Sequence, residues 1–325
     1  MKNYSVRLYQ KNDFDLWNSF VEQAKNATFL FHRNFMDYHS SRFNDFSLLV
    51  FEGNKLVAIV PANRVDANVF SHQGLTYGGL VLNQQAKMIS ILSIFRSILV
   101  FLQSCQVEKF IIKTIPTFYC NSFCDELHYV LFLTQSVRLE SNICSVLNLK
   151  DSLNFSKKRL NEIKKGVQNN LIIVEEVDFE LFWNEILIPN LEQKHQSKPV
   201  HSLAEIRQLK SFFPNQIRQF NVYKNQILQG GTTVFVLKNG VHSQYISAND
   251  TKNQTGCLDF LHHYLITDKF KNLDFFDFGT SNEHNGTKIN EGLLYWKQSF
   301  GAQIVTQDFY EVQTKNHILL NNVLI

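Results

Sequence analysis

The sequence predicts an α+β protein built from two similar units, each a mixed, mostly antiparallel sheet flanked by helices. Its 325 residues exceed one ordinary domain and suit two, which we expect at residues 1–150 and 151–325. A hydrophobic fraction of 44%, with 29 Phe, supplies two cores. In each half a β-hairpin precedes strand-helix-strand segments, an order typical of α+β folds.

The second half repeats features of the first in the same order. Asp13 opens an amphipathic helix with Asp-Phe-Asp-Leu-Trp-Asn, and Asp178 opens another with Asp-Phe-Glu-Leu-Phe-Trp-Asn. Downstream of each lies an apolar hairpin whose turn contains Asn54 or Asn225. The offset between the copies is nearly constant, which indicates an internal duplication.

Hydrophobic periodicity predicts the elements of the second half. We expect strands at 219–223, 226–237, 241–248, 273–278 and 303–312. We expect helices at 179–193, 203–212, 256–269 and 289–300, and a connecting helix within 151–170. In the first half, the apolar window 88–102 contains Arg96 and falls short of the about 20 residues of a membrane span, so it predicts a buried helix.

The net charge and the cysteines limit the classes of function that fit the sequence. A net charge of +3 is too small for a general nucleic-acid binder, so any anion site must be local. The N-terminus has no apolar core of the signal-peptide type, and we expect a cytoplasmic protein. Five cysteines form no paired framework. Cys120 and Cys124 could hold a metal, but no second pair lies at zinc-finger spacing, so we expect free thiols and no metal.

A polar loop near the C-terminus is a candidate ligand site. Residues 273–278 predict a buried strand that breaks at a glycine, and a short helix with one lysine among aromatic residues follows. The candidate residues of this region are Gly279, Thr280, Ser281, Glu283, His284, Tyr295 and Lys297. For Lys297 the alternative is a surface lysine on an amphipathic helix.

The segment 156–167 carries the clearest cluster of positive charge. Leu160, Ile163 and Val167 recur at helical spacing and predict the buried stripe. Lys157 and Lys164 are seven residues apart and therefore share the outward side, as do Lys158 and Lys165. Lysines in a first helical turn oppose the helix dipole, and a bound anion would compensate. Candidate phosphate ligands are Lys157, Arg159 and Lys164; the alternative is a solvated helix face.

Further candidates lie outside these two motifs. Tyr77, Gly78 and Gly79 form a turn without P-loop spacing, which could admit a ligand beside a stacking tyrosine or be a tight connection between strands. His195 follows the helix at 179–193 on an expected loop, where it could reach a substrate or be a surface histidine. Two candidate substrate ligands on the strand at 241–248 are Gln244 and Tyr245.

The Asp-Phe-Gly at 277–279 and the Tyr-Trp-Lys-Gln-Ser-Phe-Gly at 295–301 resemble the end of the FemAB-like acyltransferases, which belong to the GNAT superfamily. In that family an Asp-Phe-Gly strand end precedes a Tyr-x-Phe-Lys-x-x-Phe-Gly helix. The resemblance covers nearly the whole chain, with its specific residues mainly after residue 150. It implies two tandem GNAT-like units.

The resemblance also implies an activity: N-acyl transfer to the amine of a nucleotide-linked amino sugar or of a cell-wall or surface-polysaccharide precursor. The acceptor would carry phosphate or be lipid-linked. Lys297 would lie near the transferred acyl group, and Glu283 or His284 would be the base. The segment 159–165 loosely matches the family's Arg-x-x-Ile-Arg-Lys stretch, which contacts a nucleotide, tRNA or lipid phosphate.

The donor implied by the resemblance is acyl-CoA or aminoacyl-tRNA. GNAT enzymes that use acyl-CoA hold its pyrophosphate with an Arg/Gln-x-x-Gly-x-Gly/Ala loop. Here residues 253–258 retain only Gly256 of that pattern, which weakens the case for acetyl-CoA. FemAB-like aminoacyltransferases use aminoacyl-tRNA without that loop. The alternative function is a catalytically silent GNAT-like protein that binds RNA or a phosphorylated ligand.

Overall fold

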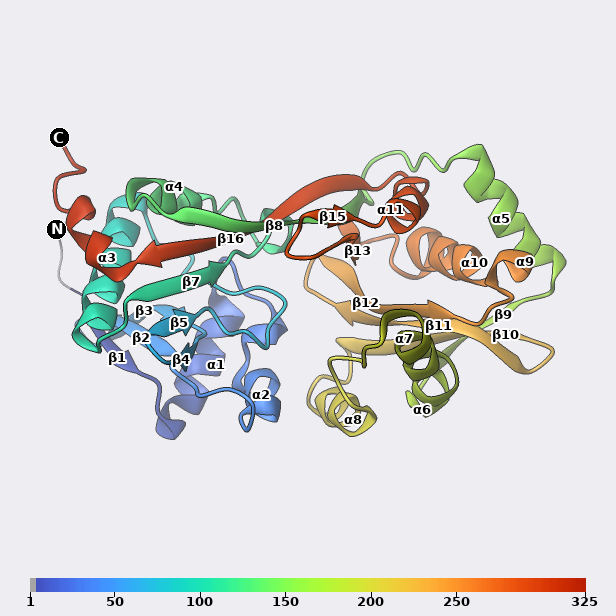
Figure 1. The fold of residues 1–325 in the computed structure, drawn as a ribbon, viewed down its shortest axis with the longest axis horizontal. Helices are drawn as coiled ribbons and strands as arrows, with labels where there is room; N and C mark the ends of the chain where they lie inside the picture. Colours follow the sequence, from blue (N-terminus) through green and yellow to red (C-terminus); the bar gives the residue numbers. More distant parts are fainter. Residues whose placement is uncertain (1–3) are drawn as a thin grey trace. The chain divides into compact units, whose positions relative to one another are not determined.

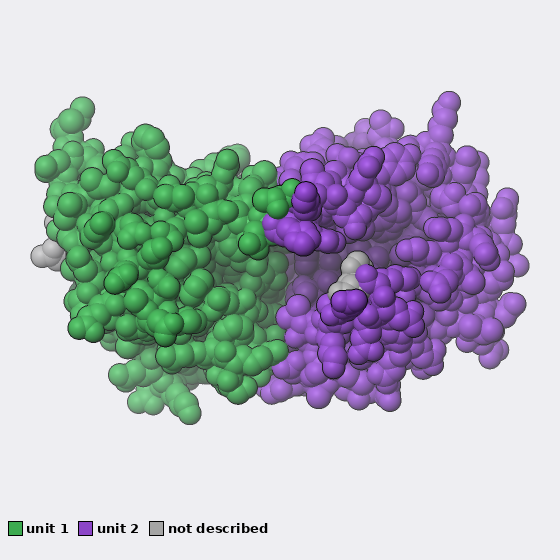
Figure 2. All heavy atoms as spheres, in the orientation of Figure 1, with its two compact units in different colours: residues 1–142, 285–287, 306–325 green, residues 143–284, 288–305 purple. Residues whose placement is uncertain are grey.

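The chain forms two compact units (Figure 2). The structure is a computed structural model that describes residues 4–325, apart from the side chain of His195. Unit 1 contains the residues up to Asn142 together with Asn285–Thr287 and Thr306–Ile325. Unit 2 contains Ile143–His284 and Lys288–Val305. Unlike the expected contiguous halves, the C-terminal segment therefore returns to the first unit.

Unit 1 contains two groups of strands. One sheet has the antiparallel order β1 (Ser5–Leu8), β2 (Leu48–Glu52), β3 (Lys55–Val60) and β6 (Val81–Leu82). The other strands are β4 (Asn63–Val65), β5 (Asn68–Phe70), β7 (Lys109–Lys113) and the end of β16 (Gln303–Gln313). The hairpin predicted at Asn54 is confirmed, because β2 pairs antiparallel with β3.

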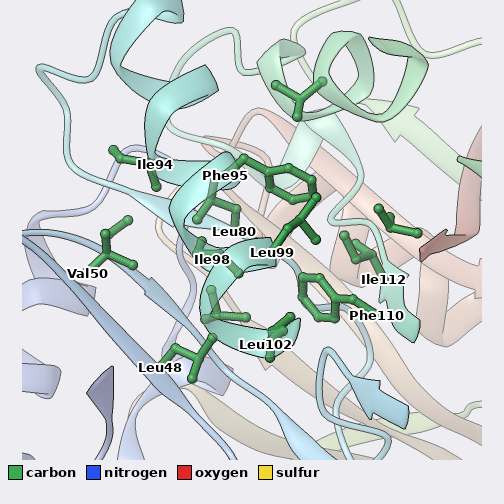
Figure 3. Close-up of a cluster of buried hydrophobic side chains, with 14 of the residues drawn as sticks. Leu48, Val50, Leu80, Ile94, Phe95, Ile98, Leu99, Leu102, Phe110 and Ile112 are labelled. Carbon is green, nitrogen blue, oxygen red and sulfur yellow. The ribbon is translucent and has the colours of Figure 1, made fainter. Parts of the chain in front are cut away.

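The core of unit 1 is built on helix α3 (Met88–Ser104), which confirms the predicted buried helix. Its side chains pack against the strands that flank it (Figure 3), with Phe95 and Ile98 fully buried. The other α-helices of the unit are α1 (Phe14–Gln23), α2 (Arg33–Met36) and α4 (Glu126–Leu133). Within residues 4–325 no helix has the length and apolar character required to span a bilayer.

Unit 2 contains a sheet of six strands. In spatial order they are the second half of β8 (Val137–Asn148, of which residues 143–148 belong to unit 2), β13 (Phe275–Thr280), β12 (Gly240–Ala248), β11 (Ile227–Val236), β10 (Ile217–Lys224) and β9 (Ile172–Glu176). Neighbours are antiparallel except β12 and β13, which run parallel. The strands predicted for the second half are confirmed, whereas β9 lies outside the predicted segments.

Helices cover both faces of the unit 2 sheet (Figure 1). One face carries α5 (Lys157–Gln168), α9 (Lys252–Thr255) and α10 (Cys257–Tyr264), and the other carries α6 (Glu180–Phe182), α7 (Ile188–His195) and α8 (Leu203–Phe212). Single π-helical turns at Trp183–Leu187 and Leu265–Lys269 extend α6 and α10. Helix α11 (Glu291–Gln298) follows the loop after β13. The predicted helices of this half are therefore confirmed.

The two tryptophans of the repeated motif occupy equivalent positions in their units. Trp17 and Trp183 are both fully buried near the start of a helical segment that precedes a hairpin. The indole N–H of Trp17 donates to the carbonyl of Phe31 at 2.8 Å, and that of Trp183 donates to the carbonyl of His201 at 3.3 Å. This shared anchoring supports the internal duplication.

Candidate functional site

The site begins where the parallel strands β12 and β13 separate. They pair only from Gly240 with Phe275 to His242 with Asp277. Beyond that point β12 continues against β11 alone, and β13 continues against β8. A register shift interrupts β12 at Gln244 and another interrupts β13 after Asp277. In sheets with parallel strands, such a divergence at the carboxyl ends is a common place for ligand binding.

A cavity of about 820 Å³ lies in unit 2 beside the end of β12. This volume suits a small ligand or the end of a larger one. The walls come from α5, α7, the end of β12, the segment from α9 into α10, and α11. The polar residues that line it are Lys158, Arg159, Glu162, Lys165, Asn190, Lys194, Ser247, Lys252, Asn253, Asp259, Glu283, Asn290 and Tyr295.

Positive charge exceeds negative charge in the cavity wall. The lining has five cations (Lys158, Arg159, Lys165, Lys194 and Lys252) against three carboxylates (Glu162, Asp259 and Glu283). Three of the cations have carboxylate partners: Asp259 for Arg159, Glu162 for Lys165 and Asp250 for Lys194. No ion pair within the described residues involves the other two, Lys158 and Lys252. The Nζ of Lys158 lies 5.1 Å from the ring centroid of Tyr295. The wall therefore offers free positive charge beside an aromatic ring.

The predicted buried stripe of α5 is wrong in two of its three positions. Ile163 is buried, but Leu160 is 41% exposed and Val167 is 62% exposed. The buried face consists of Arg159, Ile163 and Gly166. Gly166 determines this rotation because helix α10 passes so close that a Cβ there would lie 2.4 Å from the Cβ of Phe260.

The rotation of α5 also decides which lysines face the cavity. Lys158 and Lys165 line it, whereas Lys157 and Lys164 are exposed outside it. Both pairs have the seven-residue spacing that marks one side of a helix, so the sequence pattern could not separate them. The cavity lysines on α7 and α9, Lys194 and Lys252, had no motif to signal them.

Arg159 joins three helices at the base of the cavity. It is 3% exposed, its Nε donates to Ser299 Oγ at 2.8 Å, and its guanidinium forms an ion pair with Asp259. The guanidinium carbon lies 4.8 Å from the ring centroid of Phe300. Burial lowers the pKa of Arg159 to about 10. The predicted phosphate ligand therefore also holds α5 to α10 and α11.

Lys297 is buried, contrary to the alternative of a surface lysine. It is 2% exposed, and its ammonium donates to the carbonyls of Gly279 at 3.0 Å and Thr280 at 2.6 Å. Burial lowers the pKa of Lys297 to about 8, and the carboxylate of Asp277 partly opposes this. Gly279 has a φ of +74°, a conformation that favours glycine, at the register shift of β13 where these carbonyls lie. Lys297 thus fixes α11 to the end of β13.

The remaining residues of the loop after β13 lie in different environments. Glu283 is exposed and lines the cavity, whereas His284 is exposed, has a φ of +51° and is not part of the lining. The side chain of Thr280 is exposed. The hydroxyl of Ser281 is buried and has no hydrogen-bond partner within the described part of the chain.

Two predicted ligands on β12 have different surroundings. Tyr245 packs against Trp183 with ring centroids 5.2 Å apart, and its hydroxyl lies 2.6 Å from His201 Nδ1. Burial raises the pKa of Tyr245 to about 12. Gln244 is half-buried at the register shift, and its Oε1 lacks a hydrogen-bond partner among the described atoms. His195 ends helix α7 instead of lying on a loop, and its side chain is outside the described residues.

The glycine-rich turn of unit 1 is packed within its own unit. Tyr77 is 2% exposed, its hydroxyl lies 2.8 Å from Thr28 Oγ1, and its ring packs on Tyr119. Gly78 donates its N–H to the carbonyl of Lys113 at 2.7 Å, and Gly79 has a φ of +98°. Buried contacts of this kind agree with the tight connection between strands.

The fold matches known structures although the sequence matches none closely. No family model matches the chain, and no curated protein does either. The structure of FemX superposes with a TM-score of 0.66 at 8% identity, covering 98% of this chain and 99% of FemX. L-PGS from Bacillus licheniformis gives 0.57 at 10% identity over 96% and 93% of the two chains. A tandem GNAT protein from the clavulanic acid biosynthesis pathway gives 0.50 at 10% identity over 96% and 99%. The chain therefore has the tandem GNAT fold seen in FemAB-like proteins.

Proposed function

We propose that this chain, which has the tandem GNAT fold of FemX, is an N-acyltransferase. It would move an acyl or aminoacyl group to the amine of a nucleotide-linked amino sugar or of a cell-wall or surface-polysaccharide precursor. One observation carries the proposal: a cavity with free lysines and an aromatic ring lies beside the end of β12, beyond the residues that pair with β13. Acyl-CoA and aminoacyl-tRNA both combine phosphates with an adenine base, so either matches that wall.

The open edge of β12 supports the placement of the acyl donor. Beyond His242 this strand has no ladder with β13, so its backbone groups on that side can pair with an extended ligand. The cavity lies at the end of the same strand, beside Ser247 and Ala248. A donor with its phosphates at Lys158 and Lys252 would direct its acyl end along β12 toward Gly279 in β13.

Lys297 and Glu283 are the proposed catalytic side chains. The acceptor amine attacks the acyl carbonyl carbon, and the tetrahedral oxyanion then expels the donor's thiol or ribose hydroxyl. The Lys297 ammonium would stabilise the oxyanion, because a buried charge acts strongly where water is excluded. Glu283 would accept the amine proton and pass it to the leaving group, which is released as the neutral thiol or hydroxyl. His284 remains a second candidate for that proton.

Donor binding tests the site before any product is known. Acetyl-CoA, longer acyl-CoAs and aminoacyl-tRNA should each be titrated against wild type, with the melting temperature as the readout, because specific binding stabilises the fold. Lys158→Glu should abolish the shift caused by the true donor. Lys157→Glu is the matched control, since that lysine lies on the same helix but outside the cavity.

Acyl transfer itself is tested by mass spectrometry. The protein and donor are incubated with a panel of UDP- and dTDP-linked amino sugars and with lipid-linked precursors, and acyl adducts are sought. An adduct formed by wild type but not by Lys297→Met supports the assignment. Tight RNA binding without any adduct would instead favour the silent binding protein.

A further inference from the structure

A histidine and an aspartate meet at the last paired position of β12 and β13. The two residues are register partners, and Nδ1 of His242 lies 2.7 Å from Oδ2 of Asp277. The side chain of Asp277 is 1% exposed, whereas that of His242 is 13% exposed. The pair therefore joins a buried carboxylate to an imidazole that solvent reaches. No candidate predicted from the sequence includes this histidine.

Asp277 determines which nitrogen of the imidazole carries the proton. Its Oδ1 accepts the N–H of Gly279 at 2.7 Å, and its negative charge acts on the ammonium of Lys297. A carboxylate offers only acceptor atoms, so its hydrogen bond to His242 places a proton on Nδ1. In the neutral ring the lone pair is then on Nε2, which can accept a proton.

The imidazole lies against the same residue as the proposed oxyanion-stabilising lysine. A Cβ built on Gly279 would lie 3.3 Å from Cε1 of His242, and the carbonyl of Gly279 accepts a hydrogen bond from Lys297 at 3.0 Å. Asp277 interacts with all three residues. The end of β13 thus brings a proton acceptor and a buried cation to one place in unit 2.

Buried polar atoms without partners occur at the same strand positions. Ser243 and Gln244 follow His242 on β12, and Ser281 follows Thr280 at the end of β13. Within the described residues, no hydrogen-bond partner exists for the hydroxyls of Ser243 and Ser281 or for Oε1 of Gln244. Buried polar atoms in folded proteins normally have partners. A bound polar group or water beside these strands would supply them.

The proposed acyl transfer needs a base before the attack as well as during it. Near neutral pH an aliphatic amine is largely an ammonium ion, which has no lone pair with which to attack a carbonyl carbon. One proton must therefore leave the acceptor first. An imidazole changes its charge close to neutral pH, so it is well suited to take that proton and release it again.

We propose that His242, oriented by Asp277, takes the first proton from the acceptor ammonium, an inference that rests on the proposed acyl transfer. Nε2 accepts the proton, and the electrons of the broken N–H bond stay on the acceptor nitrogen as its lone pair. The carboxylate of Asp277 stabilises the resulting imidazolium. The neutral amine attacks the acyl carbonyl carbon, and the imidazolium releases its proton to water. Glu283 handles the second proton, which the tetrahedral intermediate loses.

The test measures kcat and KM of acyl transfer by mass spectrometry. His242→Ala should lower kcat at least about a hundredfold, and added imidazole should restore part of the rate because it fills the space of the lost ring. Asp277→Asn should lower kcat without a response to imidazole, since it acts through His242. His128→Ala, which removes a partly exposed histidine of unit 1, should stay within about twofold. Circular dichroism and the melting-temperature shift with donor check that each variant folds and binds donor.

Nuclear magnetic resonance of ¹⁵N-labelled histidine gives a readout that needs no activity. The signals of His242 are those lost in His242→Ala, and in the neutral ring they should show the proton on Nδ1. A proton on Nε2 instead would overturn the proposal. Wild type without any acyl adduct would refute the transferase function and this step together. If wild type is active, full kcat in His242→Ala, or a lost rate that imidazole does not restore, overturns the role of His242 alone.

Discussion

Replacing Lys297 by methionine should change how the stability of the protein depends on pH. Methionine keeps much of the length of the side chain but removes the ammonium that contacts the carbonyls of Gly279 and Thr280. Burial lowers the pKa of Lys297 to about 8, against 10.5 for an ordinary lysine. Between those values the unfolded chain binds more protons than the folded one. The wild type therefore gains stability from this group as the pH rises from about 8 toward 10.5.

The size of the effect follows from the two pKa values. Their difference of about 2.5 corresponds to about 3 kcal/mol of cost for keeping the buried ammonium charged. Most of that cost, about 2.5 kcal/mol, is relieved between about pH 7 and about pH 10. Lys297→Met has no buried ammonium at this position, so its stability does not gain from this loss of a proton. The free energy of unfolding of wild type, minus that of the variant, should thus grow by about 2 to 3 kcal/mol over this range.

Urea unfolding of both proteins at several pH values measures this difference. Groups that titrate alike in both proteins cancel, so the change with pH reports Lys297 alone. Lys157→Met is the control, because it removes an exposed lysine of the same unit and its difference from wild type should stay flat. A flat difference for Lys297→Met as well would refute the buried ammonium. The proposed activity adds a second measurement: turnover should fall above about pH 8 as the ammonium loses its proton.

Three further changes test the site and its support. Lys158→Glu should weaken donor binding at least about tenfold in a calorimetric titration, whereas Lys157→Glu should stay within about twofold; equal losses would contradict the cavity assignment. Gly166→Ala should lower the free energy of unfolding by about 1–3 kcal/mol, because its Cβ would lie 2.4 Å from a side chain of α10. At Gly292 the nearest atom to an added Cβ would be 3.9 Å away, so Gly292→Ala should change the free energy of unfolding by less than about 0.5 kcal/mol. Equal effects of the two glycine substitutions would argue against close packing of α5. His262 is fully buried, and burial lowers its pKa to about 4, so wild type should lose up to about 3 kcal/mol of stability as the pH falls from about 6.5 to 4. His262→Phe should lose less stability over the same range. Identical acid unfolding curves of the two proteins would refute this.

Local patterns predicted the elements well wherever their signals were complete. Helix α8 begins and ends where the periodicity placed it, and Ser202 and Glu205 form a capping box at its start. The hairpins at Asn54 and Asn225 follow from apolar runs around turn residues. Strand β9 was missed; much of it is exposed, and such a strand lacks the alternation of apolar and polar residues that marks a half-buried one.

The site was only partly predictable for a different reason. Arg159, Glu283 and Tyr295 were predicted and line the cavity, yet Lys158 and Lys252 were not chosen. The side of α5 that faces the cavity depends on how closely α10 approaches Gly166, and that distance is not encoded within α5 itself. The cavity also draws on α7 and α11, which are distant in sequence and carry no shared motif.

The sequence by itself determined the α+β class, the repeated unit and most elements of the second half. These rest on periodicity, turn residues and motifs, which act over a few residues. Only the tertiary structure decided that Lys297 is buried against backbone carbonyls and that β12 and β13 stop pairing after His242. It also decided that Lys158 and Lys165 line the cavity whereas Lys157 and Lys164 do not. Burial and the rotation of a helix depend on contacts between segments far apart in the chain, and no local pattern contains them.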